Sequence, residues 1–222
     1  MTIAEYWRIS PNIFTFAIAV GLKPFGGFPF NFSIPRVDRI HEVEWDDLPP
    51  VVTRQFKDPV RQFERAGFNY LFAYELPLLE RNRLGMAAVL ISKDALTFAT
   101  VNYAQDPTTR QRQCNCVSVF DDTTKGVTTT AKKMMKPHPQ YRTQRHPEAQ
   151  ADVLSEHHKQ HLAERDEEFS IRPIRLDAAA VREAVLDGEQ GHVDFNIERR
   201  VYIPMSKEEI RKIRDVHTDD DD

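Results

Sequence analysis

Four short apolar segments follow one another between residues 84 and 132, with no helical pattern between them. They are rich in β-branched and aromatic residues, and turn-forming pairs such as Lys93-Asp94 and Asp106-Pro107 separate them. Strands joined by such short connections pair antiparallel, because a parallel pair needs a long crossover. The pattern therefore predicts an antiparallel meander with strands at 84–92, 96–104, 114–121 and 126–132.

The segments before this meander predict one helical region between two further strands. Apolar residues recur at three- and four-residue steps up to Ala66, which predicts a helix or a helix pair in which Pro59 can open the second piece, with Gly67 as the C-terminal stop. Residues 36–45 and 68–77 have strand patterns on either side. The predicted fold class is therefore α+β: an antiparallel β-meander of about five strands packed against helices.

Charge and proline content change after residue 123. No acidic residue occurs from there to residue 147, and the prolines of this segment exclude a regular helix. Residues 148–168 are acidic and predict a helix with a stripe that contains Val153 and Leu154. The remainder predicts a C-terminal strand/helix extension, with a helix from 178 that Gly188 ends, a strand at 193–204, and a last helix opened by the capping box of Ser206 and Glu209.

These patterns divide the chain into four parts. Residues 1–35 form an N-terminal apolar arm, 36–168 the α+β core domain, 169–217 the C-terminal extension or small lobe, and 218–222 an acidic tail. The longest apolar run of the arm, residues 13–22, is far shorter than the roughly 20 residues that a membrane-spanning helix needs. We therefore expect no membrane span.

Composition bears on the type of partner and on the cellular compartment that we expect for this chain. The 222 residues are 41% hydrophobic and carry a net charge of −4, which the four C-terminal aspartates alone supply. The remainder is neutral, so we expect no specific nucleic-acid partner. The two cysteines, Cys114 and Cys116, lie two apart on one face of a strand, where we interpret them as apolar core residues. Reduced thiols fit a cytoplasmic location.

One histidine cluster is a candidate metal site. On a helix, His157 and His161 are four residues apart and His158 and His161 three, so two imidazoles can point at one ion. The glutamate that follows the first histidine in the metalloprotease helix pattern is absent, because His158 occupies its place. The alternative is a solvated helix face without a metal.

A basic loop is a candidate anion site. Its cations surround Tyr141 and could hold a phosphate or a single-stranded nucleic acid by charge and stacking. The acidic helix that follows offers these cations a nearer partner, which would remove their attraction for polyanions. The candidate anion-binding residues are Lys132, Lys133, Lys136, Arg142 and Arg145.

The element order, a strand, helical pieces, several antiparallel strands and a later long helix, is similar to the helix-grip arrangement of lipid-transfer and polyketide-cyclase-like proteins. That resemblance implies a curved sheet wrapped around a helix and an apolar ligand. The alternative is that the same aromatic residues fill the core. The ligand-binding residues implied are Tyr70, Phe72, Tyr74, Phe98, Tyr103 and Phe120.

No catalytic signature appears. The chain lacks the glycine-rich phosphate loop and the G-x-S-x-G nucleophile motif, so we assign no catalytic residue and expect no cofactor. Three hypotheses follow. The first is a non-catalytic interaction or regulatory module whose partner is another protein or a second copy of this chain. The second is a small-molecule binding cup of the helix-grip type, and the third is a metal-dependent enzyme that uses the histidine helix.

Overall fold

The computed structural model describes residues 32–34, 37–76, 84–105, 109–132, 136–169, 172–206 and 208–209. Lys133, the acidic tail and the N-terminal arm other than residues 32–34 lie outside them. The chain splits into two compact units. The larger comprises Arg39–Lys132 and Pro139–Asp187, and the smaller comprises the described parts of Met1–Asp38, Lys133–His138 and Gly188–Asp222. The sequence-based division into four parts stays a prediction.

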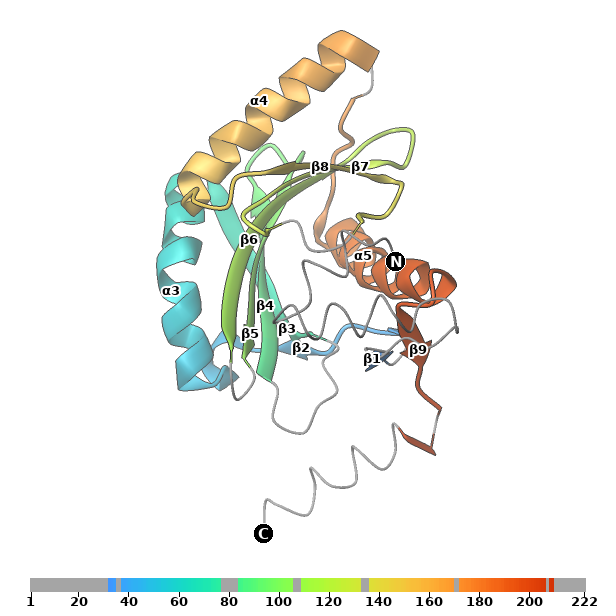
Figure 1. The fold of residues 1–222 in the computed structure, drawn as a ribbon. Coiled ribbons are helices and arrows are strands. Elements are labelled where there is room, and N and C mark those ends of the chain that lie inside the picture. The colour runs from blue at the N-terminus through green and yellow to red at the C-terminus, as the bar shows by residue number, and fades with distance from the viewer. Residues whose placement is uncertain are drawn as a thin grey trace. The chain divides into compact units, whose positions relative to one another are not determined.

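The larger unit contains a seven-stranded sheet in the order β2-β3-β4-β5-β6-β7-β8 (Figure 1). All neighbours pair antiparallel except β7 and β8, which are parallel. The strands are β2 (Glu42–Val43), β3 (Phe68–Glu75), β4 (Leu84–Ser92), β5 (Phe98–Gln105), β6 (Arg110–Val119), β7 (Lys125–Thr129) and β8 (Tyr141–Arg145).

The α+β class and the antiparallel meander are confirmed, and the prediction of about five strands is wrong. The meander corresponds to β3–β7, and two edge strands complete the sheet. β2 lies within the strand predicted at 36–45 but is only two residues long, and the short 3-10 helix η2 (Trp45–Asp47) follows it. β8 lies in the proline-containing basic segment, where the proline content concealed its five residues.

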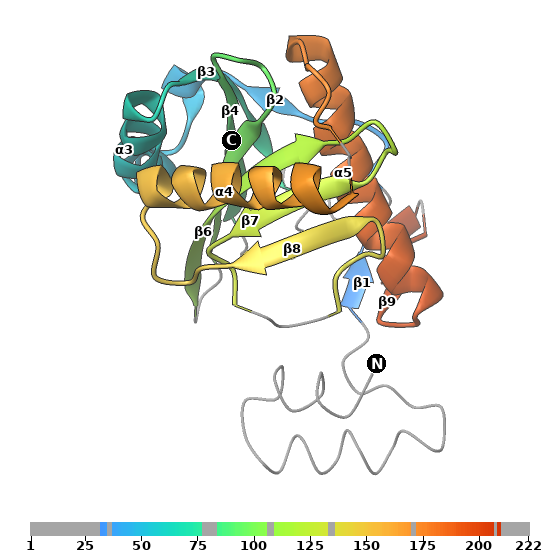
Figure 2. The ribbon, with the colours of Figure 1, turned by 90° about the horizontal axis from the view of Figure 1, so that it is seen from above.

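Helices α3 (Pro50–Arg65) and α4 (Ala151–Phe169) cover one face of the sheet (Figures 1 and 2). Phe56 and Phe63 of α3 and Leu154 of α4 are fully buried there. The opposite face packs against the first half of α5 (Ala178–Glu198), where Val181 and Val185 meet the aromatic residues of β3 and β5. The sheet thus has an apolar layer on both faces, as the predicted apolar runs require.

Helix α3 runs through Pro59 without a break, so of the two alternatives, one helix or a helix pair, the structure has the single helix. A proline has no backbone N–H, and the carbonyl of Gln55, four residues earlier, therefore loses its helical donor. Arg112 of β6 lies 3.4 Å from that carbonyl oxygen and donates a hydrogen bond to it. The helix ends where predicted, because Gly67 has a φ of 92°, a left-handed conformation that favours glycine.

A β-bulge interrupts β3. Tyr70 pairs with Leu90 of β4, but Phe72 pairs with Val89, so two steps along β3 correspond to one step along β4. The extra residue, Leu71, reverses the alternation of side chains. Residues 68 and 70 consequently face α3, whereas residues 72 and 74 face α5.

The C-terminal elements differ from their prediction in one respect. α5 does not end at Gly188 but continues to Glu198, so most of the predicted strand at 193–204 is wrong, and only β9 (Tyr202–Pro204) is extended. β9 pairs in parallel with β1 (Phe32–Ile34) in the smaller unit. Val193 is only 2% exposed, and its burial favours the helix beyond Gly188.

The capping box is confirmed. The Ser206 hydroxyl lies 2.7 Å from Oε2 of Glu209, and the backbone N–H of Glu209 donates to Ser206 Oγ at 3.2 Å. Among the described helices, none is long and apolar enough to cross a membrane.

Adjacent residues of α4 provide a test of this packing. Leu154 is fully buried and Val153 is 47% exposed. We expect Leu154→Ala to lower the free energy of unfolding by about 2–5 kcal/mol, because it leaves a cavity under the helix. Val153→Ala should change it by less than about 0.5 kcal/mol. Urea unfolding of both variants makes the comparison, and equal losses would contradict the orientation of α4.

Candidate functional site

An open groove of about 510 Å³ lies beside α3 in the larger unit. One wall is the outer face of α3, with Thr53, Lys57, Arg61 and Glu64, and the floor contains two aromatic residues from the edge of the sheet. Ligand sites commonly have volumes of roughly 300–1,000 Å³. The groove has the size of such a site and opens to solvent.

The aromatic floor consists of Trp45 and Tyr70. Their ring centroids are 5.3 Å apart at 81°, an edge-to-face contact, and Trp45 also packs against Phe56 at 6.4 Å. Trp45 belongs to η2, and Tyr70 immediately precedes the bulge in β3. The contact with Phe56 anchors the floor to the core, while both groove aromatics stay partly exposed.

The bulge at Leu71 places Tyr70 in this groove. Phe72 and Tyr74 follow it at strand spacing but lie on the other face of the sheet. Burial, and next to it the negative charges of Glu44 and Glu42, raise the pKa of the Tyr70 hydroxyl to about 12. The hydroxyl is therefore protonated near neutral pH and available as a hydrogen-bond donor.

Two cations form the helical wall of the groove. Lys57 and Arg61 are four residues apart, so they are neighbours on one exposed face of α3. Neither forms an ion pair with another described residue. Like charges at this spacing destabilise a helix by about 0.2–0.5 kcal/mol. Their position beside an open aromatic floor favours an anionic ligand.

A second polar cluster lies under α4, where His158 is enclosed by hydroxyl groups. Nε2 of His158 is 3.1 Å from Ser118 Oγ, and Nδ1 is 2.9 Å from Thr128 Oγ1. Ser118 Oγ also lies 2.7 Å from the carbonyl oxygen of Leu96 and 2.9 Å from Thr97 Oγ1. His158 is only 1% exposed, so these contacts replace its hydration.

These contacts specify the tautomer of His158. The Leu96 carbonyl can only accept, so the Ser118 hydroxyl donates its proton there and accepts from Nε2–H of the ring. Nδ1 is then unprotonated and accepts the hydroxyl proton of Thr128. Burial, with the nearby His161 as the smaller cause, lowers the pKa of His158 to about 3. The ring is neutral and fully hydrogen-bonded.

The Ser118–His158 pair is a structural contact rather than a nucleophile and its base. Ser118 has no exposed surface, and its hydroxyl proton is donated to a backbone carbonyl rather than to the imidazole. The other ring nitrogen is bonded to Thr128, where a catalytic triad has a carboxylate. This cluster therefore stabilises the contact between α4 and the sheet.

The structure separates the three predicted metal ligands. His158 and His161 point under α4, where His161 Nδ1 is 3.5 Å from Thr128 Oγ1. His157 instead stacks on His146, with ring centroids 4.0 Å apart. Both nitrogens of His158 already have partners, and the described residues contain no group of three metal-binding side chains. The geometry thus gives the metal hypothesis no support.

The residues of the implied ligand cup lie on two faces of the sheet. Tyr70 and Tyr103 pack toward α3 and α4, whereas Phe72, Tyr74 and Phe98 pack toward α5. Phe120 is also buried and lies beneath the Arg165 guanidinium, 5.1 Å from the ring centroid. The structure therefore does not bring these six side chains together around one cavity.

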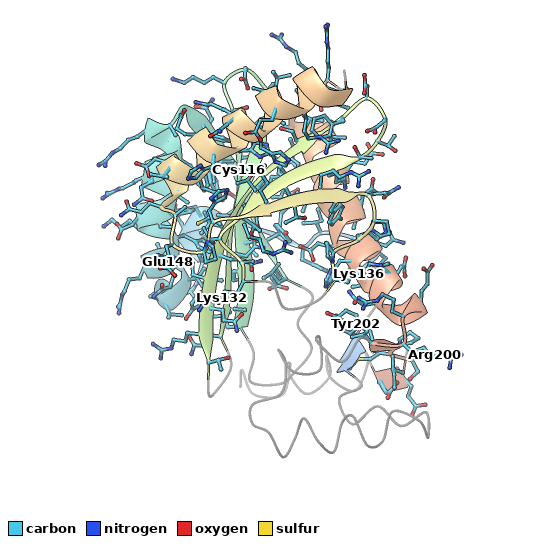
Figure 3. All side chains as sticks on the ribbon, turned by 45° about the horizontal axis from the view of Figure 1, so that its top comes forward. Cys116, Lys132, Lys136, Glu148, Arg200 and Tyr202 are labelled. Carbon is cyan, nitrogen blue, oxygen red and sulfur yellow. The ribbon has the colours of Figure 1, made fainter. Side chains whose placement is uncertain are left out.

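The basic candidates belong to two different units of the chain. Lys132, Arg142 and Arg145 belong to the larger unit and Lys136 to the smaller one, while Lys133 lies outside the described residues. Figure 3 labels Lys132 and Lys136. Arg142 is exposed on the edge strand β8. The larger unit alone thus retains three of these five cations.

The two cysteines are free and buried on the face that α4 covers (Figure 3, Cys116). Burial raises the pKa of Cys114 to about 11 and that of Cys116 well above the usual value. Both remain thiols near neutral pH and are therefore poor nucleophiles and metal ligands. Their placement agrees with the interpretation as core residues.

The sequence analysis missed Trp45, Lys57 and Arg61 as site residues. Trp45 was placed at the end of a strand, and the helix was regarded only as a cover for the sheet. The available signal was the pair of like charges at i and i+4 on an otherwise amphipathic helix, although Asp58 and Glu64 lie three residues before and after Arg61. The bulge that adds Tyr70 to them has no sequence signal of its own.

Comparison with protein-family models, with curated proteins and with solved structures finds no significant match for this chain. The functional argument therefore depends on the geometry of the groove and of the histidine cluster.

The histidine cluster predicts a pH dependence of stability. Because the folded chain keeps His158 neutral down to about pH 3, the unfolded chain binds one more proton between about pH 6.5 and 3. The contribution of neutral His158 to the free energy of unfolding is fully present above pH 6.5. It decreases as the pH falls, by about 2 kcal/mol at pH 5. Unfolding titrations should show a shallower decrease for His158→Gln than for the neighbouring control His157→Gln.

A second measurement holds even if His158→Gln fails to fold. In ¹⁵N-histidine NMR spectra of the unmodified chain at pH 5, one ring should show the neutral Nε2–H tautomer. A fully protonated set of histidines in the folded protein would contradict the assignment.

Proposed function

We propose that the larger unit is a non-catalytic protein-binding module whose ligand-binding surface is the groove beside α3. The observation that carries this proposal is the partly exposed Trp45–Tyr70 pair beside a cationic face that has no ion pair with another described residue. Tryptophan, tyrosine and arginine are the residues enriched where binding energy concentrates in protein interfaces. All three residue types meet here on one concave surface.

The absence of a reactive group within the groove supports binding rather than catalysis. The described residues that line it include no histidine or cysteine, and the one carboxylate among them, Glu64, is exposed on the helix. The Tyr70 hydroxyl, with its raised pKa, is a donor rather than a base near neutral pH. The buried Ser118–His158 pair has no access to a substrate.

The groove is also held by rigid elements. η2 contacts α3 through Trp45 and Phe56, and the bulge fixes Tyr70 at a point where β3 is paired with β4. A surface that is formed before binding loses less conformational entropy when a ligand is bound. We therefore expect binding without rearrangement of the sheet.

Peptide binding tests this proposal. The chain has two tryptophans, so Trp7→Phe leaves Trp45 as the only fluorophore of its kind. A random dodecamer phage library would be selected on the immobilised Trp7→Phe chain, and synthetic versions of the recovered peptides titrated by fluorescence. We expect micromolar dissociation constants and a change in Trp45 emission, because the ligand displaces water from the indole.

Two matched substitutions locate the bound peptide. Thr53→Phe fills the groove and should weaken binding about tenfold, roughly 1.4 kcal/mol. Val153→Phe adds the same ring to an exposed position of α4 outside the groove and should leave binding unchanged. Recovery of no binding peptide, or equal binding by the two variants, would refute the proposed module.

A further inference from the structure

We propose that the groove recognises an acidic peptide segment of a partner protein, with an apolar or aromatic side chain on Trp45 and Tyr70 and carboxylates facing Lys57 and Arg61. This inference depends on the proposed function and specifies the chemistry of its ligand. Four features of the groove support it: the aromatic floor, the cationic helical wall, the carboxylates around them and the length of the wall.

The floor selects an anchor side chain. Trp45 and Tyr70 meet edge to face, so each ring leaves part of its surface to a third apolar group, and Val60 lies at the base of the same groove. An aromatic or large aliphatic side chain can complete this cluster by stacking and by exclusion of water. The groove volume of about 510 Å³ accommodates such a side chain together with its backbone.

The wall selects negative charge. Lys57 and Arg61 are both exposed, and neither has an ion pair with a residue that the structure describes. A carboxylate placed between them relieves their mutual repulsion and can accept a two-pronged hydrogen bond from the arginine. Asp58 and Glu64 lie three residues before and after Arg61 and offset part of this repulsion, so a bound carboxylate relieves what remains of it.

The acids around the groove favour a peptide over a nucleic acid. Glu64 lines the wall, and the charges of Glu44 and Glu42 act on Tyr70 at the floor. Among these three acids, Glu42 alone has a cationic partner in the described part of the chain, with two contacts of 2.5 and 3.0 Å to Arg182. A nucleic-acid backbone carries a negative charge at every nucleotide, so these carboxylates repel it. A peptide can place its acids opposite the two cations alone.

The length of the wall favours a chain over a small molecule. Thr53 and Glu64 are separated by 11 residues of helix, which is about 16 Å at 1.5 Å per residue. An extended peptide of about five residues covers that distance at roughly 3.3 Å per residue. A segment of this length can place its anchor on the aromatic floor and its acids along the same wall as Lys57 and Arg61.

The test uses a fluorescein-labelled pentapeptide with a central phenylalanine and two acidic residues on each side. Its binding to the full chain is measured by fluorescence anisotropy. Peptides with the acids replaced by glutamine or by lysine, and one with the phenylalanine replaced by alanine, are the ligand controls. We expect each control peptide to bind at least tenfold more weakly, and binding of the acidic peptide to weaken as salt is raised.

Charge reversal locates the acidic groups. Lys57→Glu combined with Arg61→Glu should reduce affinity more than tenfold, because the peptide then meets repulsion. Arg175→Glu changes the same type of charge at an exposed position between α4 and α5, outside the groove, and should alter affinity less than about twofold. Circular dichroism of each variant confirms that the fold is kept, as expected for exposed positions.

The outcomes separate this inference from the proposed module. Peptides that bind at Trp45 but prefer glutamine or lysine, or that ignore charge reversal on α3, would overturn the acidic ligand and leave the module standing. No binding by any peptide, including those from the library, would overturn both. Tighter binding of a single-stranded DNA 20-mer that is lost in the α3 double variant would assign the groove to nucleic acid instead.

Discussion

The single extra residue in β3 determines how the two faces of the sheet are used. Without Leu71 as a bulge, Tyr70, Phe72 and Tyr74 would all project from one face. With it, Tyr70 joins Trp45 beside α3, while Phe72 and Tyr74 supply the core against α5. One backbone irregularity therefore provides both the aromatic floor of the groove and the second apolar layer.

The parts of the fold that the sequence predicts are those with a strong local pattern. The limits of β4, from Leu84 to Ser92, and the glycine stop of α3 agree with their predictions because periodicity and backbone preference decide them. At Pro59 and Gly188, tertiary contacts override the local preference of these residues for a helix boundary. Arg112 replaces the hydrogen-bond donor that Pro59 lacks, and burial of Val193 favours a helix beyond the glycine.

The candidate sites show the same limit more clearly. The histidine spacing on α4 does belong to a helix, but spacing does not tell which ring faces the sheet. The ring that does, His158, has both nitrogens hydrogen-bonded to hydroxyl groups of β6 and β7. The groove residues come from η2, α3 and β3, and only tertiary structure brings them together. The charge pattern along the sequence indicates which residues are exposed, but it does not show which of them line the same groove.

The parallel pairing of β7 and β8 has a consequence for how the chain can be divided. The connection between these strands runs through residues assigned to the smaller unit, and α5 passes from the larger unit into the smaller one. The larger unit is thus a discontinuous domain, assembled from two stretches of sequence. Truncation at either terminus cannot isolate it, and a minimal version requires a redesigned loop between Lys132 and Pro139 together with a new end for α5 near Asp187.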